Sequence, residues 1–212
     1  MSSLPDIPPS PARVVLLTGP SGSGKSSFAE RCGLPVLCLD DFYKEIDDPT
    51  LPLVPDTSDV DWDSPRSWDA DTALAALTEL CTTGRTGVPV YDISTSSRTG
   101  VKEVALAGAP LVIAEGIFAA EIVGRCRERG LLADAICLRG RPATTFRRRL
   151  VRDLRESRKP VGFLLRRGWR LMRSERGIVG RQVRLGAHAC GPSEAAARVA
   201  GALGADTGVR TG

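Results

Sequence analysis

Residues 19–27, GPSGSGKSS, follow directly on the apolar run RVVLLT at 13–18. Glycines fixed after a buried strand cost backbone entropy, which another interaction has to offset. The spacing from Gly19 to Gly24-Lys25-Ser26 fits a phosphate-binding loop, in which backbone N–H groups and the N-terminal end of the next helix surround an anion. A Gly/Ser-rich linker is the alternative, but the strand before the loop and the helical pattern after it favour a nucleoside triphosphate site.

The loop predicts specific contacts with ATP and Mg²⁺. Lys25 can reach the β- and γ-phosphates, and the Ser26 hydroxyl can ligate Mg²⁺. The predicted nucleotide-binding residues are Gly19, Ser21, Gly22, Ser23, Gly24, Lys25, Ser26 and Ser27.

The bulk composition fits a single domain. The chain has 212 residues, a formal net charge of +4 and 5% aromatic residues, so its core must be aliphatic. We expect a folded domain over 12–203 and flexible tails at 1–11 and 204–212. No apolar stretch reaches the ~20 residues of a membrane span, and the first residues lack the basic and apolar regions of a secretory signal.

The six cysteines include no C-x-x-C pair, which favours reduced thiols and a cytoplasmic protein over a disulfide framework or a zinc site. His188, the only histidine, lies near Cys190, but a metal site needs more ligands than these two. We expect no membrane partner, and the sequence leaves a homo-oligomer open.

Apolar runs and helical patterns alternate along the chain. The predicted strands are 13–18, 34–39, 109–115 and 134–139, and the predicted helices are 24–32, 69–82, 118–129 and 142–156. This alternation predicts an α/β fold of the P-loop NTPase type, a parallel sheet with helices on both faces. Ligands bind such sheets beyond the carboxyl ends of the strands.

Residues 45–106 predict a small insertion over that edge of the sheet, on the acceptor side. Residues 45–68 are rich in Pro and Asp and have no helical period, which is typical of a functional loop. Residues 88–106 alternate apolar and polar side chains around a Gly-bearing turn and predict a hairpin.

Two carboxylates stand at the ends of predicted strands. Asp40 follows the strand expected beside the phosphate loop, where it can accept a hydroxyl proton or hold metal-bound water; a helix cap or turn is the alternative. Glu115 interrupts the run LVIAEGIF, where a nearby Mg²⁺ would compensate its charge; an ion pair with an arginine is the alternative.

Positive charge is concentrated in residues 139–184, which hold 16 Arg or Lys and three acids. Nucleic acid and a polyphosphate are the two candidate ligands of such a segment. We expect a mobile lid over about 157–168 whose arginines act on the phosphates of ATP.

Six motifs occur in one order within residues 14–158: GPSGSGKSS, LDDFYK, DWDSPRSWD, PVYDISTSSR, EGIF and RRRLVRDLRESR. In these motifs the chain resembles the uridine kinase/phosphoribulokinase family of P-loop kinases, and most of all its uridine kinase branch. The phosphate loop alone is unspecific, whereas DDFY followed by D-W-D-x-P and PVYD…SR is much more specific. The resemblance implies a phosphotransferase that uses ATP and Mg²⁺ and an alcohol group of a nucleoside-like small molecule as acceptor.

The resemblance also implies roles for the matched residues. Asp40 would be the general base, with Lys25 and Arg158 as the other catalytic residues. Ser26 and Glu115 would serve Mg²⁺ together with Asp40.

On the acceptor side, the resemblance implies that Asp63 holds the ribose hydroxyls and that Tyr91 packs beside the base. The implied acceptor-binding residues are Tyr43, Asp63, Tyr91, Ser96, Arg98, Arg149 and Arg152. Uridine kinases carry a histidine in the PVYD segment that hydrogen-bonds the pyrimidine, and this chain has Ser96 there. Asp63 can accept two hydrogen bonds from neighbouring hydroxyls, so we expect a ribose-like or other polyhydroxylated acceptor. A hydroxyl cannot reach as far as an imidazole, so with Ser96 we expect poor discrimination at the pyrimidine edge.

Three other functions stay open. A nucleic-acid-binding NTPase would use the basic segment, but only Phe146, Phe163 and Trp169 accompany its arginines and no groove-reading motif is visible, which argues against nucleic acid as a partner. The second is a kinase of a non-nucleoside metabolite. The third is a nucleotide-dependent regulatory protein without turnover, although it would not need Asp40.

Overall fold

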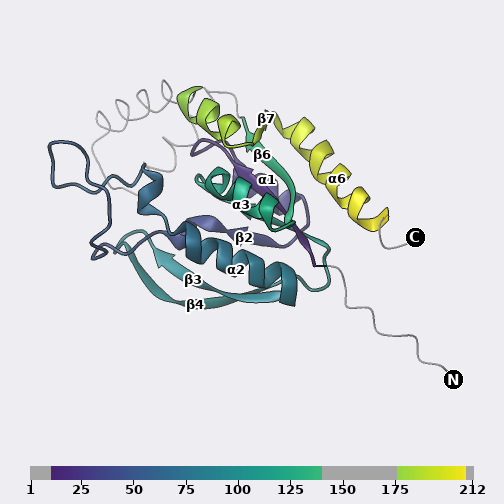
Figure 1. Ribbon diagram of the computed structural model, residues 1–212, viewed down its shortest axis with the longest axis horizontal. Coiled ribbons are helices and arrows are strands. Elements are labelled where there is room, and N and C mark those ends of the chain that lie inside the picture. The colour runs from purple at the N-terminus through teal and green to yellow at the C-terminus, as the bar shows by residue number, and fades with distance from the viewer. Residues whose placement is uncertain (1–10, 140–175, 209–212) are drawn as a thin grey trace.

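The computed structural model describes residues 11–139 and 176–208 of the chain (Figure 1). Its centre is a five-stranded sheet in the order β2-β5-β1-β6-β7, in which every neighbouring pair is parallel. The strands are β1 (Arg13–Thr18), β2 (Val36–Cys38), β5 (Leu111–Glu115), β6 (Leu132–Leu138) and β7 (His188–Cys190). The first four confirm the predicted strands, and the parallel sheet confirms the predicted fold class.

The register of the central strands decides which residues meet at the carboxyl edge of the sheet. Leu17 of β1 pairs with Glu115 of β5, and Cys38 of β2 pairs with the same Glu115. Because parallel strands end at one edge, the residues that follow β1 and β2 lie beside the end of β5. The phosphate loop, Asp40 and Glu115 therefore share this edge.

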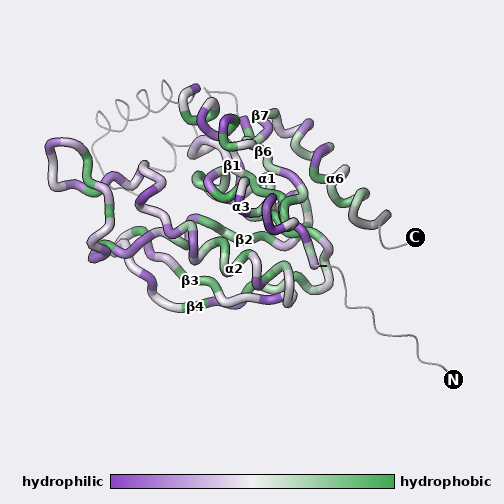
Figure 2. Tube along the Cα trace, in the orientation of Figure 1, coloured by the Kyte–Doolittle hydropathy of each residue, from purple (hydrophilic) through white to green (hydrophobic). Residues whose placement is uncertain are grey.

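Side chains of β1 alternate between two apolar layers, as the period of a strand requires. Val14 and Leu16 belong to a cluster with α2 and α3, whereas Val15 and Leu17 belong to a cluster with α1 and α6. Helices thus cover both faces, and Figure 2 shows the hydrophobic strands between them. The helices are α1 (Lys25–Arg31), α2 (Ala70–Thr83), α3 (Val123–Glu128) and α6 (Pro192–Gly208).

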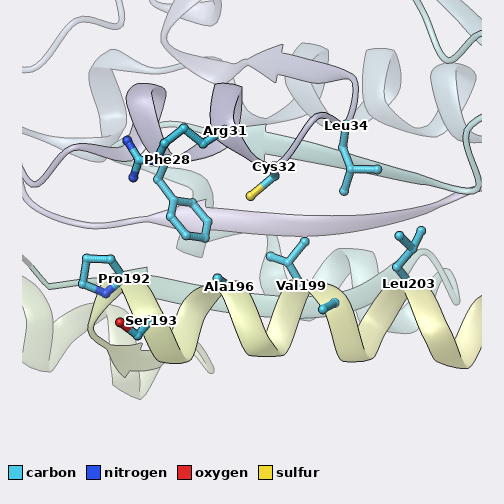
Figure 3. A pocket seen from close by; sticks show the side chains of 10 residues that line it. Phe28, Arg31, Cys32, Leu34, Pro192, Ser193, Ala196, Val199 and Leu203 are labelled. Atoms are coloured by element: carbon cyan, nitrogen blue, oxygen red, sulfur yellow. The ribbon is translucent and has the colours of Figure 1, made fainter.

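Helices α1 and α6 lie side by side and leave a groove of about 420 Å³ between them (Figure 3). Phe28 and Cys32 line it from α1 and its C-terminal cap, and Ala196 and Val199 line it from α6. None of the predicted site residues contributes to this groove.

The predicted hairpin is present, with a different turn. Strands β3 (Arg85–Asp92) and β4 (Ser97–Ala105) form an antiparallel sheet of their own. The turn lies at 93–96, whereas the glycine expected in it, Gly100, is a residue of β4 that pairs with Val90. The Gly-bearing turn is therefore a wrong prediction. The reversal is made by the glycine-free residues 93–96, ISTS, in which Ser96 adopts a φ of 50°.

Helix α2 divides the predicted insertion into two parts. Its side chains Leu74, Leu77 and Leu80 are fully buried in the main core. The insertion therefore consists of the loop at 45–68 and the β3–β4 hairpin, and α2 between them belongs to the body of the domain.

After residue 175 the described chain resumes with helical residues 176–184, and β7 and α6, which the sequence did not predict, follow. Helix α6 continues to Gly208, past the residue 203 at which we placed the end of the domain. The predicted helix 142–156 and the predicted lid lie outside the described residues. Within 11–139 and 176–208, no helix combines the length and the hydropathy needed to cross a membrane.

Candidate active site

The phosphate loop joins β1 to α1 and depends on its glycines. Gly19 has a φ of 143°, and a Cβ there would lie 2.5 Å from the carbonyl oxygen of Leu138. Gly22 and Gly24 have φ values of 77° and 95°, in the left-handed region that favours glycine. A side chain at Gly19 would collide with the backbone of β6, so glycine is required for the loop to lie this close to the sheet.

Lys25 and Ser23 place polar groups inside the loop region. Lys25 is only 7% exposed, and its Nζ donates to the carbonyl oxygen of Gly19 at 3.1 Å. The Oγ of Ser23 is buried and has no hydrogen-bond partner among the described residues. A buried hydroxyl without a partner is unusual, and an oxygen of a bound phosphate would satisfy it. The loop therefore fits a triphosphate.

Ser26, Glu115 and Asp40 bring three oxygen ligands to the same edge. The Ser26 hydroxyl donates to Glu115 Oε1 at 2.8 Å. Burial raises the pKa of Glu115, while the Ser26 hydrogen bond and the charge of Lys25 oppose that rise. Burial also raises the pKa of Asp40, against the charge of Lys25. A hydroxyl and carboxylates are the hard donors that Mg²⁺ takes, so these residues fit the ion predicted for them.

The turn after β5 holds Asp40 in place. The N–H of Ile117 donates to Asp40 Oδ1 at 3.2 Å. A Cβ at Gly116 would lie 2.8 Å from Leu39 Cβ and 3.0 Å from Asp40 Oδ1, so only glycine allows this approach. Gly116 and Ile117 belong to the EGIF motif, but the sequence alone did not indicate that they contact Asp40.

An ion pair ties the hairpin to the neighbour of Asp40. Lys102 Nζ on β4 lies 2.7 Å from Asp41 Oδ2 in the short helix η1 (Leu39–Phe42). The two residues are 61 positions apart in the chain, and nothing in the local sequence around either one indicates the pair.

The predicted acceptor residues Tyr43 and Tyr91 belong to an aromatic cluster. The ring of Tyr43 lies 5.9 Å from Tyr91, 5.9 Å from Phe118 and 6.0 Å from Trp62, measured between ring centroids. Burial raises the pKa of Tyr43, and the charges of Asp40 and Asp63 add to the rise. Tyr43 is thus close enough to both Asp40 and the exposed Asp63 to feel their charges.

Ser96 and Arg98 sit on the hairpin beside this cluster. The Ser96 carbonyl oxygen accepts from the Ile46 N–H at 2.9 Å, and a hydrogen bond with the Ser96 side chain opposes the burial that raises the pKa of Tyr91. The Arg98 guanidinium lies 3.6 Å from Asp69 Oδ2, at the N-terminus of α2. Arg98 also lines a polar pocket of about 360 Å³, together with Lys44, Glu45, Asp47, Asp48, Pro49 and Asp69.

Comparison with known proteins places the chain in a family. A sequence profile of the Phosphoribulokinase / Uridine kinase family matches residues 53–159 of the 212. The chain belongs to this family. The uridine kinase of Schizosaccharomyces pombe is 33% identical over 160 residues, which are 72% of this chain and 34% of that protein. Inorganic pyrophosphatase TTM2 of Arabidopsis thaliana is 32% identical over 114 residues, 50% of this chain and 15% of that protein.

The chain thus spans about a third or less of the length of these relatives. A solved structure with the same fold comes from Silicibacter sp. TM1040, a protein proposed to be a fructose transport system kinase. The two structures superpose with a TM-score of 0.59 and are 20% identical in sequence. The superposition covers 84% of this chain and 88% of that one. Membership of the phosphoribulokinase/uridine kinase family agrees with the resemblance read from the motifs.

Three arginines that this family resemblance assigned to the site, Arg149, Arg152 and Arg158, lie outside the described residues. The structure also brings Glu194 close to His188 and Cys190. Within the described part of the chain, the possible ligand atoms of these three residues lie within 4.8 Å of one another. His188 Nε2 and Glu194 Oε1 are only 2.7 Å apart, whereas two such ligands of one tetrahedral ion would be separated by about 3.3 Å. A direct His–Glu contact explains the pair, and we assign no metal to it.

Proposed function

We propose that this chain is an ATP- and Mg²⁺-dependent kinase that transfers the γ-phosphoryl group to a hydroxyl of a nucleoside or a related ribose-containing molecule. The observation that supports this most directly is the convergence of Lys25, the Ser26–Glu115 pair and Asp40 at one edge of the sheet. A protein that only binds nucleotide would not need Asp40 as a second carboxylate beside the buried Glu115.

The residues divide the chemistry between them. Lys25 stabilises charge on the transferring phosphoryl group, and Ser26 with Glu115 would hold Mg²⁺, which neutralises phosphate oxygens when bound. Asp40 accepts the proton of the acceptor hydroxyl. The hydroxyl oxygen then bonds to the γ-phosphorus, and the bond from that phosphorus to ADP breaks. Asp40 suits this role because the Ile117 N–H and the Lys25 charge keep a buried carboxylate available as a base.

The acceptor would bind against the aromatic cluster. Tyr43 and Tyr91 offer flat apolar faces, and Asp63 is a carboxylate that can accept two hydrogen bonds from neighbouring hydroxyls. Ser96 offers no group with the reach of an imidazole. Arg149, Arg152 and Arg158 remain predictions for acceptor and phosphate contacts.

A kinase of a non-nucleoside polyhydroxylated metabolite is the second candidate. The observation that favours it is the polar pocket beside the hairpin, which is lined by both carboxylates and cations, Glu45, Asp69, Lys44 and Arg98 among them. Such a mixed lining suits a molecule rich in hydroxyl groups more than an apolar base.

The test is a screen for ADP release with ATP and Mg²⁺ over nucleosides, sugars and vitamins. We expect acceptor-dependent ADP release with at least one ribose-containing compound, and none with the Lys25→Ala variant. Release with sugars but no nucleoside would select the second candidate. Absence of acceptor-dependent release across the screen would contradict the kinase proposal.

A further inference from the structure

Gln182 lies on a helix at residues 176–184 that the sequence did not connect with the site. Its side chain is a buried amide in a residue that is only 5% exposed. Nε2 donates to the Ile117 carbonyl oxygen at 3.1 Å, and Oε1 accepts from the Cys137 thiol at 3.0 Å. A buried amide with both ends bonded holds its partners at fixed positions.

The backbone of Ile117 connects this amide to Asp40. Its carbonyl oxygen accepts from Gln182 and also from Thr18 Oγ1, at 3.1 Å in each case. Its N–H donates to Asp40 Oδ1 at 3.2 Å. One residue thus receives two hydrogen bonds from the body of the domain and gives one to the carboxylate.

The neighbouring backbone leaves little room for independent movement. A Cβ at Gly116 would lie 2.8 Å from Leu39 Cβ, so the turn already packs directly against the residue before Asp40. Because no free space separates the turn from Leu39, a displacement of Ile117 would also move Asp40.

We propose that Gln182 is a positioning residue for phosphoryl transfer: with Thr18, it fixes the backbone of Ile117, which in turn orients the Asp40 carboxylate toward the acceptor hydroxyl. This inference rests on the proposed function, because orientation of a base has a kinetic effect only where a proton is taken. Supporting residues of this kind matter since a misplacement of about 1 Å at a reacting group can lower a rate about 10²-fold.

The first experiment compares Gln182→Met with Arg181→Ala, using the acceptor found in the screen. Methionine keeps the volume of the side chain and removes the donor to Ile117. We expect kcat to fall about 10–100-fold while KM for ATP changes less than about 2-fold. Arg181 is the matched control, because its Nη2 bonds Glu121 Oε1 at 2.8 Å on the same side of the domain, and its loss should leave kcat unchanged. Equal losses in the two variants would overturn the proposal.

The second experiment is a double-mutant cycle with Asp40→Asn. If Gln182 acts through Asp40, then Gln182→Met should lower the residual rate of the Asp40→Asn enzyme by less than about 2-fold. The same fold loss in both backgrounds would mean that Gln182 supports the fold and not the base, and would overturn the proposal.

The third measurement keeps the inference testable if Gln182→Met does not fold. Thr18→Val removes the other donor to the Ile117 carbonyl and keeps the volume of the side chain. We expect faster hydrogen exchange at the Ile117 amide and a lower kcat; unchanged exchange and unchanged kcat would overturn the proposal. Hydrogen exchange needs no substrate, so it separates this inference from the kinase proposal, which fails only if the wild type does not turn over.

Discussion

The phosphate side and the acceptor side that we propose for the site are built differently. On the phosphate side, glycine backbone shapes the loop, Lys25 and Glu115 are buried, and Asp40 is half-buried. On the acceptor side, the groups come from a hairpin and a long loop, and Asp63 is exposed. The first arrangement tolerates few substitutions, because its geometry depends on close backbone contacts at Gly19 and Gly116. The second can change its side chains without disturbing the sheet, so it is where acceptor choice can vary.

The largest effect should come from Lys25→Ala. Lys25 is buried against the loop, and in the proposed function it stabilises charge on the transferring group, so we expect kcat to fall by about 10³-fold with the thermal midpoint nearly unchanged. ADP release and circular dichroism measure the two quantities. Arg31→Ala, the same loss of charge at the exposed end of α1, is the control and should retain activity. An active Lys25→Ala enzyme would contradict the assignment of the phosphate side.

Asp40→Asn should lower kcat by about 10²–10⁴-fold and change ATP binding far less, because an amide cannot take the acceptor proton. Asp41→Asn is the matched control, since Asp41 is engaged with Lys102 on the hairpin and not with Ile117. Steady-state kinetics and nucleotide titration together decide the role. If ATP affinity collapses instead, Asp40 is mainly a metal ligand; if both variants lose the same activity, the base is not Asp40.

The contrast also explains how far the sequence could predict the molecule. The loop GPSGSGKSS, the strands and the carboxylates after them are local signals, and the parallel topology then brings Ser26 and Glu115 together. The register of three strands does this without any further sequence signal, because parallel strands end at one edge. The meeting of the loop with Glu115 at one edge of the sheet could therefore be predicted from the chain alone.

The contacts that support the site could not be predicted from the sequence in the same way. Lys102 meets Asp41, and Gln182 meets Ile117, only after distant elements have packed. The hairpin turn was misplaced because a glycine signalled it, whereas Ser96 supplies the positive φ. The last strand and helix were missed because β7 has only three residues and the apolar pattern of α6 is weak.

Asp63→Ala tests the acceptor side directly. Loss of a charged hydrogen-bond partner for the acceptor hydroxyls should raise the acceptor KM about 10–100-fold and leave KM for ATP unchanged. Asp59→Ala, which removes an exposed carboxylate from the same loop, is the control. Initial rates at varied acceptor concentration measure the difference. A change in KM for ATP of the same size would show that the two sides are not separate.

Glu115→Gln should make the nucleotide-free protein more stable while it lowers activity. Burial raises the pKa of Glu115 above the 4.5 of an ordinary glutamate, so the folded state binds its proton more tightly than the unfolded state. Its contribution to stability is complete below about pH 4.5 and is lost as pH rises through the raised value. A neutral glutamine keeps the acceptor for Ser26, and a gain of about 1 kcal/mol at neutral pH would raise the thermal midpoint by about 2–4 °C. Scanning calorimetry at pH 7 without Mg²⁺ measures it, and a lower midpoint would contradict the account.

The smallest effect expected is a gain. Ser96 has a φ of 50°, a conformation that histidine tolerates better than most residues, and its carbonyl contact with Ile46 uses only the backbone. Ser96→His should therefore keep the hairpin and place an imidazole beside Tyr91. If the acceptor side accommodates a pyrimidine, activity on uridine or cytidine should rise by about 3–10-fold relative to a purine nucleoside.

Ser94→His, in the same turn at an exposed position, is the control. Kinetics on both nucleosides measure the ratio, and a wild type that already phosphorylates uridine efficiently while rejecting purines would mean that another side chain reads the base. The assignment of the phosphate side would be unaffected by that outcome, because the contacts of Lys25, Ser26 and Asp40 given above do not involve residues 93–96.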